Sequence, residues 1–256
     1  MKIEGKVCVV TGGAHGIGRA LCERLLRGGA AAVVVADRDF AAAARVAGGE
    51  AVSCDVSCEE DLRSLVEKTL ARHGRIDLFV SNAGIAEGGG AEASNDSWQR
   101  SWNINVMAHV WAARHVLPSM IARGEGYLLA TASAAGLLTS IGSAPYAATK
   151  HAAVAFAEWL SITHHEQGIR VSCLCPQGVN TDLLNQAVRE PAGKAVLLAG
   201  AVLEPMQVAD FTLRALEEER FLILPHPEVA SYMNRKAQEH ERWLSSMRSL
   251  QRKVLA

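Results

Sequence analysis

The chain has 256 residues, of which 49% are hydrophobic, so it can bury a full core within a single domain. Its 26 Lys and Arg residues nearly balance its 27 Asp and Glu residues, which argues against the dense basic patch of a nucleic-acid-binding surface. No uninterrupted apolar run reaches about 18 residues, which argues against a membrane-spanning helix, and the first residues lack the apolar core of a signal peptide.

Short apolar runs alternate with longer helical patterns along the chain. Strands are expected at Lys6–Thr11, Ala32–Ala36, Ala51–Cys54, Ile76–Ser81, Tyr127–Ala132, Arg170–Cys175 and Phe221–Leu224. Helices are expected at Gly16–Gly28, Glu59–His73, Ser97–Arg123, Tyr146–Gln167 and Met206–Glu219. Continuous apolar strands are typical of a parallel sheet covered on both faces. The alternation therefore predicts one domain over residues 1–256, with a Rossmann-like, doubly wound α/β fold and a seven-stranded parallel sheet.

The six cysteines lie mostly inside apolar segments. Cys54 and Cys58 stand close in sequence, as do Cys173 and Cys175, but no neighbouring Cys or His residues complete a zinc tetrad. We therefore expect buried free thiols and no metal site. Free thiols are typical of a reducing compartment, so a cytoplasmic location is expected.

A glycine-rich segment, Thr11-Gly12-Gly13-Ala14-His15-Gly16-Ile17-Gly18, connects the first strand to the first helix. Glycines let a backbone turn sharply and approach a pyrophosphate, which the positive N-terminus of a helix stabilises. The spacing differs from the standard G-x-G-x-x-G, so a tight turn without a ligand is the alternative. The strand-turn-helix context favours a nucleotide site, with His15 as a neighbour of the pyrophosphate.

Asp37 closes the second strand, 19 residues beyond Gly18. A carboxylate at that place can accept hydrogen bonds from both hydroxyls of an adenosine ribose, and it repels the 2′-phosphate of NADP. Arg38 is an opposing signal, because an arginine there can bind the same phosphate. A solvated side chain beside Asp39 is the other interpretation of Arg38. The predicted cofactor is therefore NAD in preference to NADP.

Tyr146 and Lys150 lie four residues apart within an expected helix, with Ser133 thirteen residues before the tyrosine. Side chains at this spacing share one helix face. An ammonium beside a phenol favours the phenolate and so lowers the pKa of the phenol. A free phenol titrates near pH 10, so a base that works near neutrality needs a pKa lower by roughly 3, and a second positive charge such as an oxidised nicotinamide ring can contribute.

Together these segments resemble the short-chain dehydrogenase/reductase family over about residues 5–225. Asp55-Val56, after the third strand, matches the pair that contacts adenine, and Asn82-Ala83-Gly84, after the fourth, matches the stabilising motif of the family. Val179 and Thr181 match the residues that hold the nicotinamide carboxamide. The residue patterns described above and the resemblance together predict these cofactor-binding residues: Gly12, His15, Gly16, Ile17, Gly18, Asp37, Arg38, Asp55, Val56, Asn82, Ala83, Gly84, Tyr146, Lys150, Val179 and Thr181.

The same resemblance implies a catalytic tetrad of Asn105, Ser133, Tyr146 and Lys150 and a reversible hydride transfer between a secondary alcohol and nicotinamide. Tyr146 would be the general base in oxidation, and Ser133 would donate a hydrogen bond to the substrate oxygen. Lys150 would lower the pKa of Tyr146 and hold the nicotinamide ribose. Asn105 would anchor a water that relays protons from Lys150 to solvent.

The sequence departs from the family after the sixth strand. The usual Pro-Gly-x-Val-x-Thr appears as Pro176-Gln177-Gly178-Val179-Asn180-Thr181, which we interpret as an insertion of Gln177. The Gln177 side chain is expected either to alter the pose of the cofactor or to reach the substrate.

A fairly apolar substrate is expected from leucines and other aliphatic residues near the site and in the irregular segment 183–204, a candidate mobile lid. These residues are Leu137, Leu138, Ile141, Leu183, Leu184, Val188, Leu197 and Leu198. Steroids, aryl alcohols, cyclic alcohols and hydroxyacyl thioesters all remain open. An NADPH-dependent ketone reductase is the first alternative, and a catalytically silent dinucleotide sensor is the second.

Two helices carry signals of contacts beyond the sheet. Ala152–Leu160 is apolar on nearly every face, and in the family this helix and the preceding long one pack against a second subunit, so a homodimer or homotetramer is implied. A C-terminal helical extension, about 226–256, is expected to continue from Glu228 towards Leu250 with an apolar stripe that includes Trp243. Core packing or subunit contact, a cap over the active site of a neighbouring subunit and attachment to a membrane surface are the three interpretations of this stripe.

Overall fold

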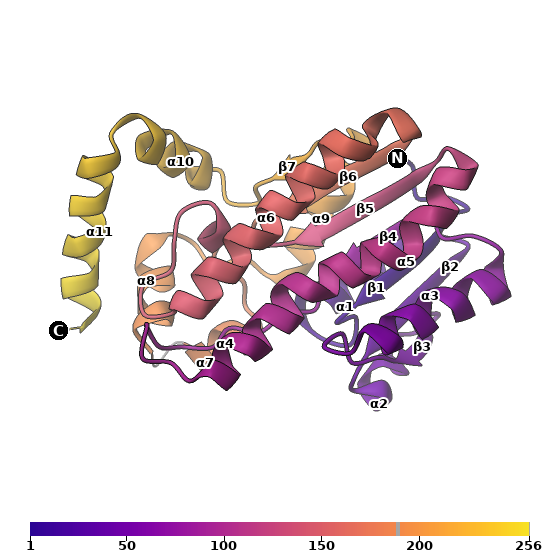
Figure 1. Cartoon of the computed structure of the whole chain (residues 1–256), viewed down its shortest axis with the longest axis horizontal. Helices are drawn as coiled ribbons and strands as arrows, with labels where there is room; N and C mark the ends of the chain where they lie inside the picture. The colour runs from indigo at the N-terminus through magenta and orange to yellow at the C-terminus, as the bar shows by residue number, and fades with distance from the viewer. Residues whose placement is uncertain (188–189, 256) are drawn as a thin grey trace.

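The computed structural model describes residues 1–187 and 190–255 and is built around one seven-stranded sheet (Figure 1). All of the paired strands run parallel, in the order β3-β2-β1-β4-β5-β6-β7. The strands are β1 (Val7–Thr11), β2 (Ala32–Asp37), β3 (Glu50–Ser53), β4 (Leu78–Ser81), β5 (Gly126–Thr131), β6 (Ile169–Leu174) and β7 (Leu222–Ile223). The predicted Rossmann-like fold with seven parallel strands is confirmed.

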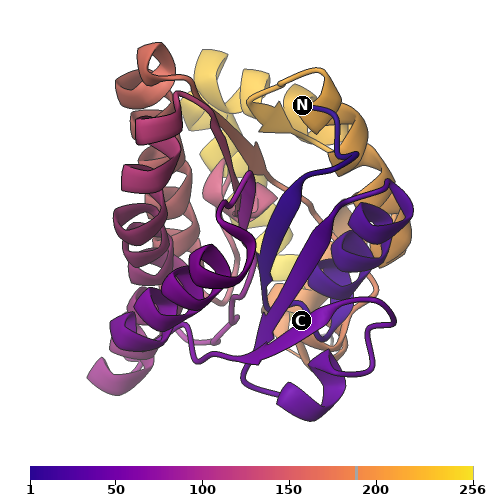
Figure 2. The same cartoon turned by 90° about the vertical axis from the view of Figure 1, so that its right-hand side faces the viewer.

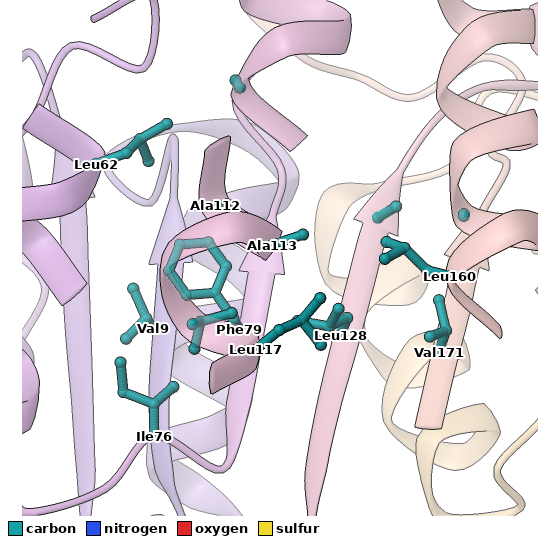
Figure 3. Close-up of a cluster of buried hydrophobic side chains, with 14 of the residues drawn as sticks. Val9, Leu62, Ile76, Phe79, Ala112, Ala113, Leu117, Leu128, Leu160 and Val171 are labelled. Atoms are coloured by element: carbon teal, nitrogen blue, oxygen red, sulfur yellow. The ribbon is translucent and has the colours of Figure 1, made fainter. Parts of the chain in front are cut away.

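Helices cover both faces of the sheet, as Figure 2 shows. Val9 of β1 packs into a cluster with residues of α3 (Glu59–His73), α5 (Ala108–Arg123) and α6 (Ala144–His164). Its neighbours Cys8 and Val10 point to the other face, against α1 (Gly16–Arg27) and α9 (Pro205–Glu217). Figure 3 shows the first of these clusters, in which Val9, Phe79 and Leu128 come from three strands. Because both faces are buried, the strands are apolar at every position rather than at alternate ones.

The strand order reverses between β1 and β4, which are neighbours at the centre of the sheet. From β1 the chain continues through β2 and β3 to one edge, and from β4 it continues through β5, β6 and β7 to the other edge. In open α/β sheets the ligand crevice lies at the carboxyl ends of the strands beside such a switch point. The glycine-rich turn after β1 and the Asn82-Ala83-Gly84 segment after β4 are therefore brought together there. The fold places both motifs at one edge of the sheet.

The helix expected over Ser97–Arg123 is divided into three parts. It begins as α4 (Asn95–Trp102), widens into a π-helical turn (Asn103–Met107) and continues as α5. The Ser94 side chain accepts a hydrogen bond from the Ser97 N–H (3.2 Å), which satisfies a free donor of the first turn. Single π-helical turns inside α-helices occur often at functional sites.

The segment 183–204 is more regular than expected. It contains α7 (Asp182–Ala187) and α8 (Pro191–Ala199), and a proline occupies the first turn of α8, where no N–H partner is lost. A further short helix, α2 (Phe40–Ala43), which the sequence did not predict, is capped by the Asp39 side chain through the Ala42 N–H (3.0 Å).

The C-terminal extension is present but is not one continuous helix. Helix α10 (Glu228–Gln238) ends at Glu239, whose φ of −131° and ψ of 59° lie outside the helical region, and α11 (His240–Leu255) follows. Figure 1 shows α11 beside α8 at the end of the molecule that is far from β2 and β3. Among residues 1–187 and 190–255, no helix combines the length and the apolar character that crossing a membrane would require.

Candidate active site

A cavity of about 660 Å³ opens at the carboxyl edge of the sheet and extends to the C-terminal helices. All of the predicted site residues line this cavity except Gly18 and Asn105. The structure therefore brings together residues that are spread over more than 160 positions of sequence, from Gly12 to Thr181.

The glycine-rich turn is closely packed against the end of β4. Gly12 has a φ of +63°, which favours glycine, and a Cβ there would lie 2.9 Å from the Ala83 Cα. A Cβ on Gly18 would lie 2.0 Å from the Gly12 carbonyl oxygen, so Gly18 serves the shape of the turn rather than the cavity wall. The Asn82 side chain donates to the carbonyls of Thr11 (3.1 Å) and Gly12 (3.3 Å) and ties the two strands together.

Asp37 lies at the far end of the cavity with its carboxylate held by backbone donors. One oxygen accepts from the Ala14 N–H (3.1 Å) and the other from the Asp39 N–H (3.0 Å). His15 contacts Asp39 (Nε2 to Oδ2, 3.2 Å), and Arg38 lines the same end while its side chain is exposed. A narrow glycine cradle beside a fixed carboxylate fits the pyrophosphate and adenosine ribose of a dinucleotide.

Asp55 and Val56 line the cavity near this end. The Asp55 carboxylate accepts from the Ser57 N–H (2.9 Å) and from the Ser57 hydroxyl (2.7 Å) through the same oxygen. The backbone N–H of Asp55 donates to Asp61 at the start of α3 (2.9 Å). These bonds fix the loop after β3 in a position from which it can contact a bound base.

Lys150 is buried at the centre of the site. Its Nζ donates to the Thr131 carbonyl at the end of β5 (3.0 Å) and lies 5.7 Å from the centre of the Tyr146 ring. Burial lowers the pKa of Lys150 to about 8, because the ammonium loses solvation, while the thiols of Cys173 and Cys175 act in the opposite direction. The ammonium is therefore partly deprotonated just above neutral pH.

The pKa of Tyr146 is raised, which is contrary to the direction expected from its spacing to Lys150. Burial is the largest cause, the hydrogen bond with Ser133 lowers the pKa, and Cys175 raises it. The spacing to Lys150 indicates only the nearby ammonium, whereas the loss of solvation on burial has the larger effect on the pKa of Tyr146. A phenolate at this position needs a further positive charge in the site.

Ser133 begins the short turn that follows β5. Its hydroxyl accepts from the Ala135 N–H (3.1 Å) and donates weakly to the Pro176 carbonyl (3.4 Å). This turn (Ala134–Gly136) is a single 3₁₀ turn packed on α6, so the Ser133 hydroxyl is fixed beside Tyr146.

Asn105 is fully buried behind the cavity wall, within the π-helical turn. Its amide donates to the Ile85 carbonyl (2.9 Å) and to the Thr149 hydroxyl (3.1 Å), and its oxygen accepts from the Ile85 N–H (3.0 Å). The position that a Cβ on Gly84 would take is 3.2 Å from the Asn105 oxygen and 3.3 Å from the Lys150 Nζ, so Asn105 and Lys150 both approach that glycine.

The segment after β6 corrects the interpretation of Gln177 as an insertion. Pro176 and Thr181 are five residues apart, as in Pro-Gly-x-Val-x-Thr, so Gln177 replaces the glycine of the motif. The backbone around it is held by the buried His226, whose Nδ1 accepts from the Gln177 N–H (3.1 Å) and whose Nε2 donates to the Gly178 carbonyl (3.0 Å). Sequence reasoning did not identify this role of His226.

The other end of the cavity is largely apolar. Five of the residues expected to form a substrate pocket do line it, namely Leu138, Ile141, Leu183, Leu184 and Leu198. Leu137 and Leu197 do not, and Val188 lies outside the described residues.

The C-terminal extension supplies the rest of this wall. Tyr232 and Arg235 of α10 line the cavity, with Trp243, Ser246, Met247 and Leu250 of α11. The apolar stripe of α11 therefore lines the cavity of its own chain, and Val254, Met247 and Leu250 also pack into a small apolar cluster, as the core-packing interpretation expected. The cap over a neighbouring subunit stays a prediction. The stripe was visible in the sequence, but nothing in the sequence located the surface that it covers.

The six cysteines are free, and five of them are buried as expected. Cys58 is exposed, because it precedes the first turn of α3 at the surface. Within residues 1–187 and 190–255, no three His, Cys, Asp or Glu side chains gather as metal ligands do.

Comparison with known proteins identifies the family. The model of the short chain dehydrogenase family matches residues 6–192. The chain belongs to that family. Consequently it is an oxidoreductase, as the sequence predicted.

Individual members of the short-chain dehydrogenase family resemble this chain over most of its length. It is 38% identical over 198 residues to 2,5-dichloro-2,5-cyclohexadiene-1,4-diol dehydrogenase of Sphingobium indicum. The aligned region covers 75% of this chain and 79% of that one. A short-chain dehydrogenase/reductase of Burkholderia phymatum, solved in complex with NAD, superposes with a TM-score of 0.85 at 31% identity and covers 94% and 96% of the two chains. The 3-ketoacyl-(acyl-carrier-protein) reductase of Brucella melitensis, complexed with NADH, gives 0.79 at 29% identity, with coverage of 88% and 98%.

Proposed function

We propose that this protein is an NAD-dependent dehydrogenase that interconverts a fairly apolar secondary alcohol and its ketone. The observation that carries the proposal is the position of Ser133, Tyr146 and Lys150 on the wall of one cavity, between a dinucleotide cradle and an apolar end. A named relative that acts on a cyclic diol supports a cyclic alcohol among the open substrate classes. Steroids and aryl alcohols remain within the same proposal.

In the proposed reaction Tyr146 takes the hydroxyl proton of the alcohol as the hydride leaves the same carbon. Ser133 donates a hydrogen bond to the substrate oxygen. Because its turn already fixes the Ser133 hydroxyl, little entropy is lost in orienting this group during the reaction. A bound nicotinamide supplies the hydride acceptor and, when oxidised, a positive charge beside the phenol. Lys150 orients the nicotinamide ribose, and Asn105 maintains the path by which the proton leaves.

NAD is proposed as the preferred cofactor because of Asp37. Both oxygens of its carboxylate are fixed by backbone donors at the adenosine end, where a 2′-phosphate would meet a negative charge. Two structural relatives are complexes with NAD or NADH, which supports the same choice. Arg38 favours the second candidate, an NADPH-dependent ketone reductase, since it is exposed and lines the same end.

The cofactor choice and the reaction are tested together by reduction of NAD and of NADP with a panel of secondary alcohols, from small aliphatic to steroidal. Wild-type protein is expected to prefer NAD, and Asp37→Ala is expected to shift the ratio of kcat/KM values at least tenfold towards NADP. A wild-type preference for NADP would establish the reductase instead.

The role of Tyr146 is tested by Tyr146→Phe, which removes the acidic hydroxyl and keeps the ring. We expect a loss of kcat of at least about a hundredfold, within the range for a general base, with NADH binding unchanged by fluorescence titration. Full activity in this variant would exclude the mechanism. Binding of NAD without turnover by wild-type protein on the whole panel would favour the silent sensor.

We also propose that the protein forms a dimer or a tetramer through α5 and α6. Trp159 is 54% exposed and Ile162 81% exposed on α6, and the Trp159 ring stacks on Phe156 with centroids 6.2 Å apart. Exposed apolar side chains that gather on one helix commonly mark an interaction surface.

A further inference from the structure

The C-terminal helices are joined to the cavity by Lys236 of α10. Its Nζ donates to the carbonyls of Leu137 and Leu138, both at 2.8 Å, and lies 5.1 Å from the centre of the Trp243 ring. Two carbonyls and one aromatic face thus surround the three donors of the ammonium. Partial burial lowers the pKa of Lys236.

These contacts connect three parts of the site that lie far apart in sequence. Leu137 and Leu138 directly follow the turn that Ser133 begins. Trp243 and Leu138 both line the apolar end of the cavity, whereas Lys236 does not. Lys236 therefore acts on the cavity through its two neighbours.

Within the described residues, a small apolar cluster also joins α11 to the rest of the molecule. The cluster between α11 and the rest of the molecule consists of Ile141, Ala195 and Val254, with Met247 and Leu250 partly buried, and it is separate from the two large clusters of the sheet. The backbone also leaves helical geometry at Glu239, between Lys236 and Trp243. Because this cluster is small and the helix is interrupted at Glu239, the position of α11 depends on the contacts of Lys236.

We propose that Lys236 is a positioning residue that holds the α10–α11 hairpin as the wall of the substrate end, and that Trp243 in this wall packs against large alcohols and so favours their binding. The inference rests on the proposed function, because it assigns the substrate to that end of the cavity. When the ammonium is removed, the hairpin loosens and the Trp243 ring no longer packs against a large substrate. Small alcohols, which do not reach Trp243, are unaffected.

The test compares cyclohexanol with 4-phenylcyclohexanol, whose additional ring would reach Trp243 under this proposal. Lys236→Met is expected to raise the KM for 4-phenylcyclohexanol about tenfold, as expected for the loss of charge-assisted hydrogen bonds. Its kcat, and both constants for cyclohexanol, should remain within about threefold of wild type. Lys236→Arg, which keeps the charge and the donors, should restore the KM, and Lys253→Met on the exposed side of α11 is the matched control.

A double-mutant cycle with Trp243→Ala tests whether the two residues act together. If Lys236 acts through Trp243, the double variant should have no higher KM for 4-phenylcyclohexanol than the worse single variant. Additive increases in KM would overturn the proposal. A fall in kcat for both alcohols at unchanged KM would also overturn it, because that result would place the effect of Lys236 on the Ser133 turn.

A second measurement does not depend on activity. Glutamyl endopeptidase cleaves after Glu239, at the break between the helices, and cleavage should be about tenfold faster in Lys236→Met than in wild type or Lys253→Met. Equal cleavage rates would refute the attachment even if neither alcohol were oxidised, whereas faster cleavage without any turnover would contradict only the proposed function. Should Lys236→Met fail to fold, Lys236→Gln retains an uncharged donor and is expected to give an intermediate rate.

Discussion

Replacing Lys150 with methionine is expected to stabilise the ligand-free protein at neutral pH. Burial lowers the pKa of Lys150 from 10.5 to about 8. At about 1.36 kcal/mol for each pH unit, the buried ammonium costs about 3 kcal/mol wherever it is charged in both states. Loss of the hydrogen bond to the Thr131 carbonyl offsets about 1 kcal/mol. The net stabilisation expected at pH 7 is about 2 kcal/mol, with loss of activity.

The pH dependence of this effect follows from the direction of the pKa change. Between pH 8 and 10.5 the unfolded chain retains a proton on Lys150 that the folded chain has released, so the unfolding free energy of wild type rises with pH. Below this window the full cost is present, and above it the cost is absent. The difference between Lys150→Met and wild type should therefore shrink by about 2 kcal/mol between pH 7 and 9.5.

Urea unfolding followed by tryptophan fluorescence measures these free energies, at one protein concentration because the proposed subunit association would add its own contribution. Lys68→Met, at an exposed position of α3, is the control, and its difference from wild type should not change with pH. A difference for Lys150→Met that is independent of pH would show that Lys150 titrates like an exposed lysine, and it would refute the reasoning.

Three further substitutions test other parts of the structure. Gly18→Ala places a Cβ 2.0 Å from the Gly12 carbonyl oxygen. We therefore expect the unfolding free energy in urea to fall by at least about 3 kcal/mol and NADH binding to be lost. Normal NADH binding would contradict the tight packing of the turn. His226→Ala leaves the Gln177 N–H and a second backbone group without their buried partner, which should lower the unfolding free energy by about 2–4 kcal/mol, and an unchanged urea midpoint would disprove this contact. Ile162→Asp puts a charge on the exposed face of α6, so light scattering should detect a smaller assembly; an unchanged mass on dilution would place the interface elsewhere.

The parts of the site that the sequence predicted are those governed by local rules. The glycine turn is recognisable because Gly12 and Gly18 are required sterically within a few residues of each other, and Asp37 because it closes a strand at a fixed distance from that turn. The seven strands were predictable because strands buried on both faces are apolar throughout. Boundaries differed by a few residues, as with β4, which begins at Leu78 rather than at Ile76.

The parts that the sequence did not predict depend on contacts between distant segments. The bonds from Lys236 to Leu137 and Leu138 span about a hundred residues, and no pattern in either segment indicates the other. The same is true of His226 and Gln177, which are 49 residues apart. The raised pKa of Tyr146 was missed because loss of solvation depends on the whole fold, whereas spacing reveals only the nearby ammonium.

The π-helical turn at Asn103–Met107 holds one residue more than an α-helix would need between α4 and α5, and the orientation of α4 relative to α5 depends on this extra residue. Deleting one residue would allow ordinary α-helical bonding from α4 into α5, but it would rotate α4 by about 100° relative to α5. Ser101, which is completely buried, would then turn away from the interior, and Asn105 would lose its bonds to Ile85. Single-residue deletions should therefore be tolerated in the loop before α4 and rejected within the turn, although the shorter helix would be the more regular one.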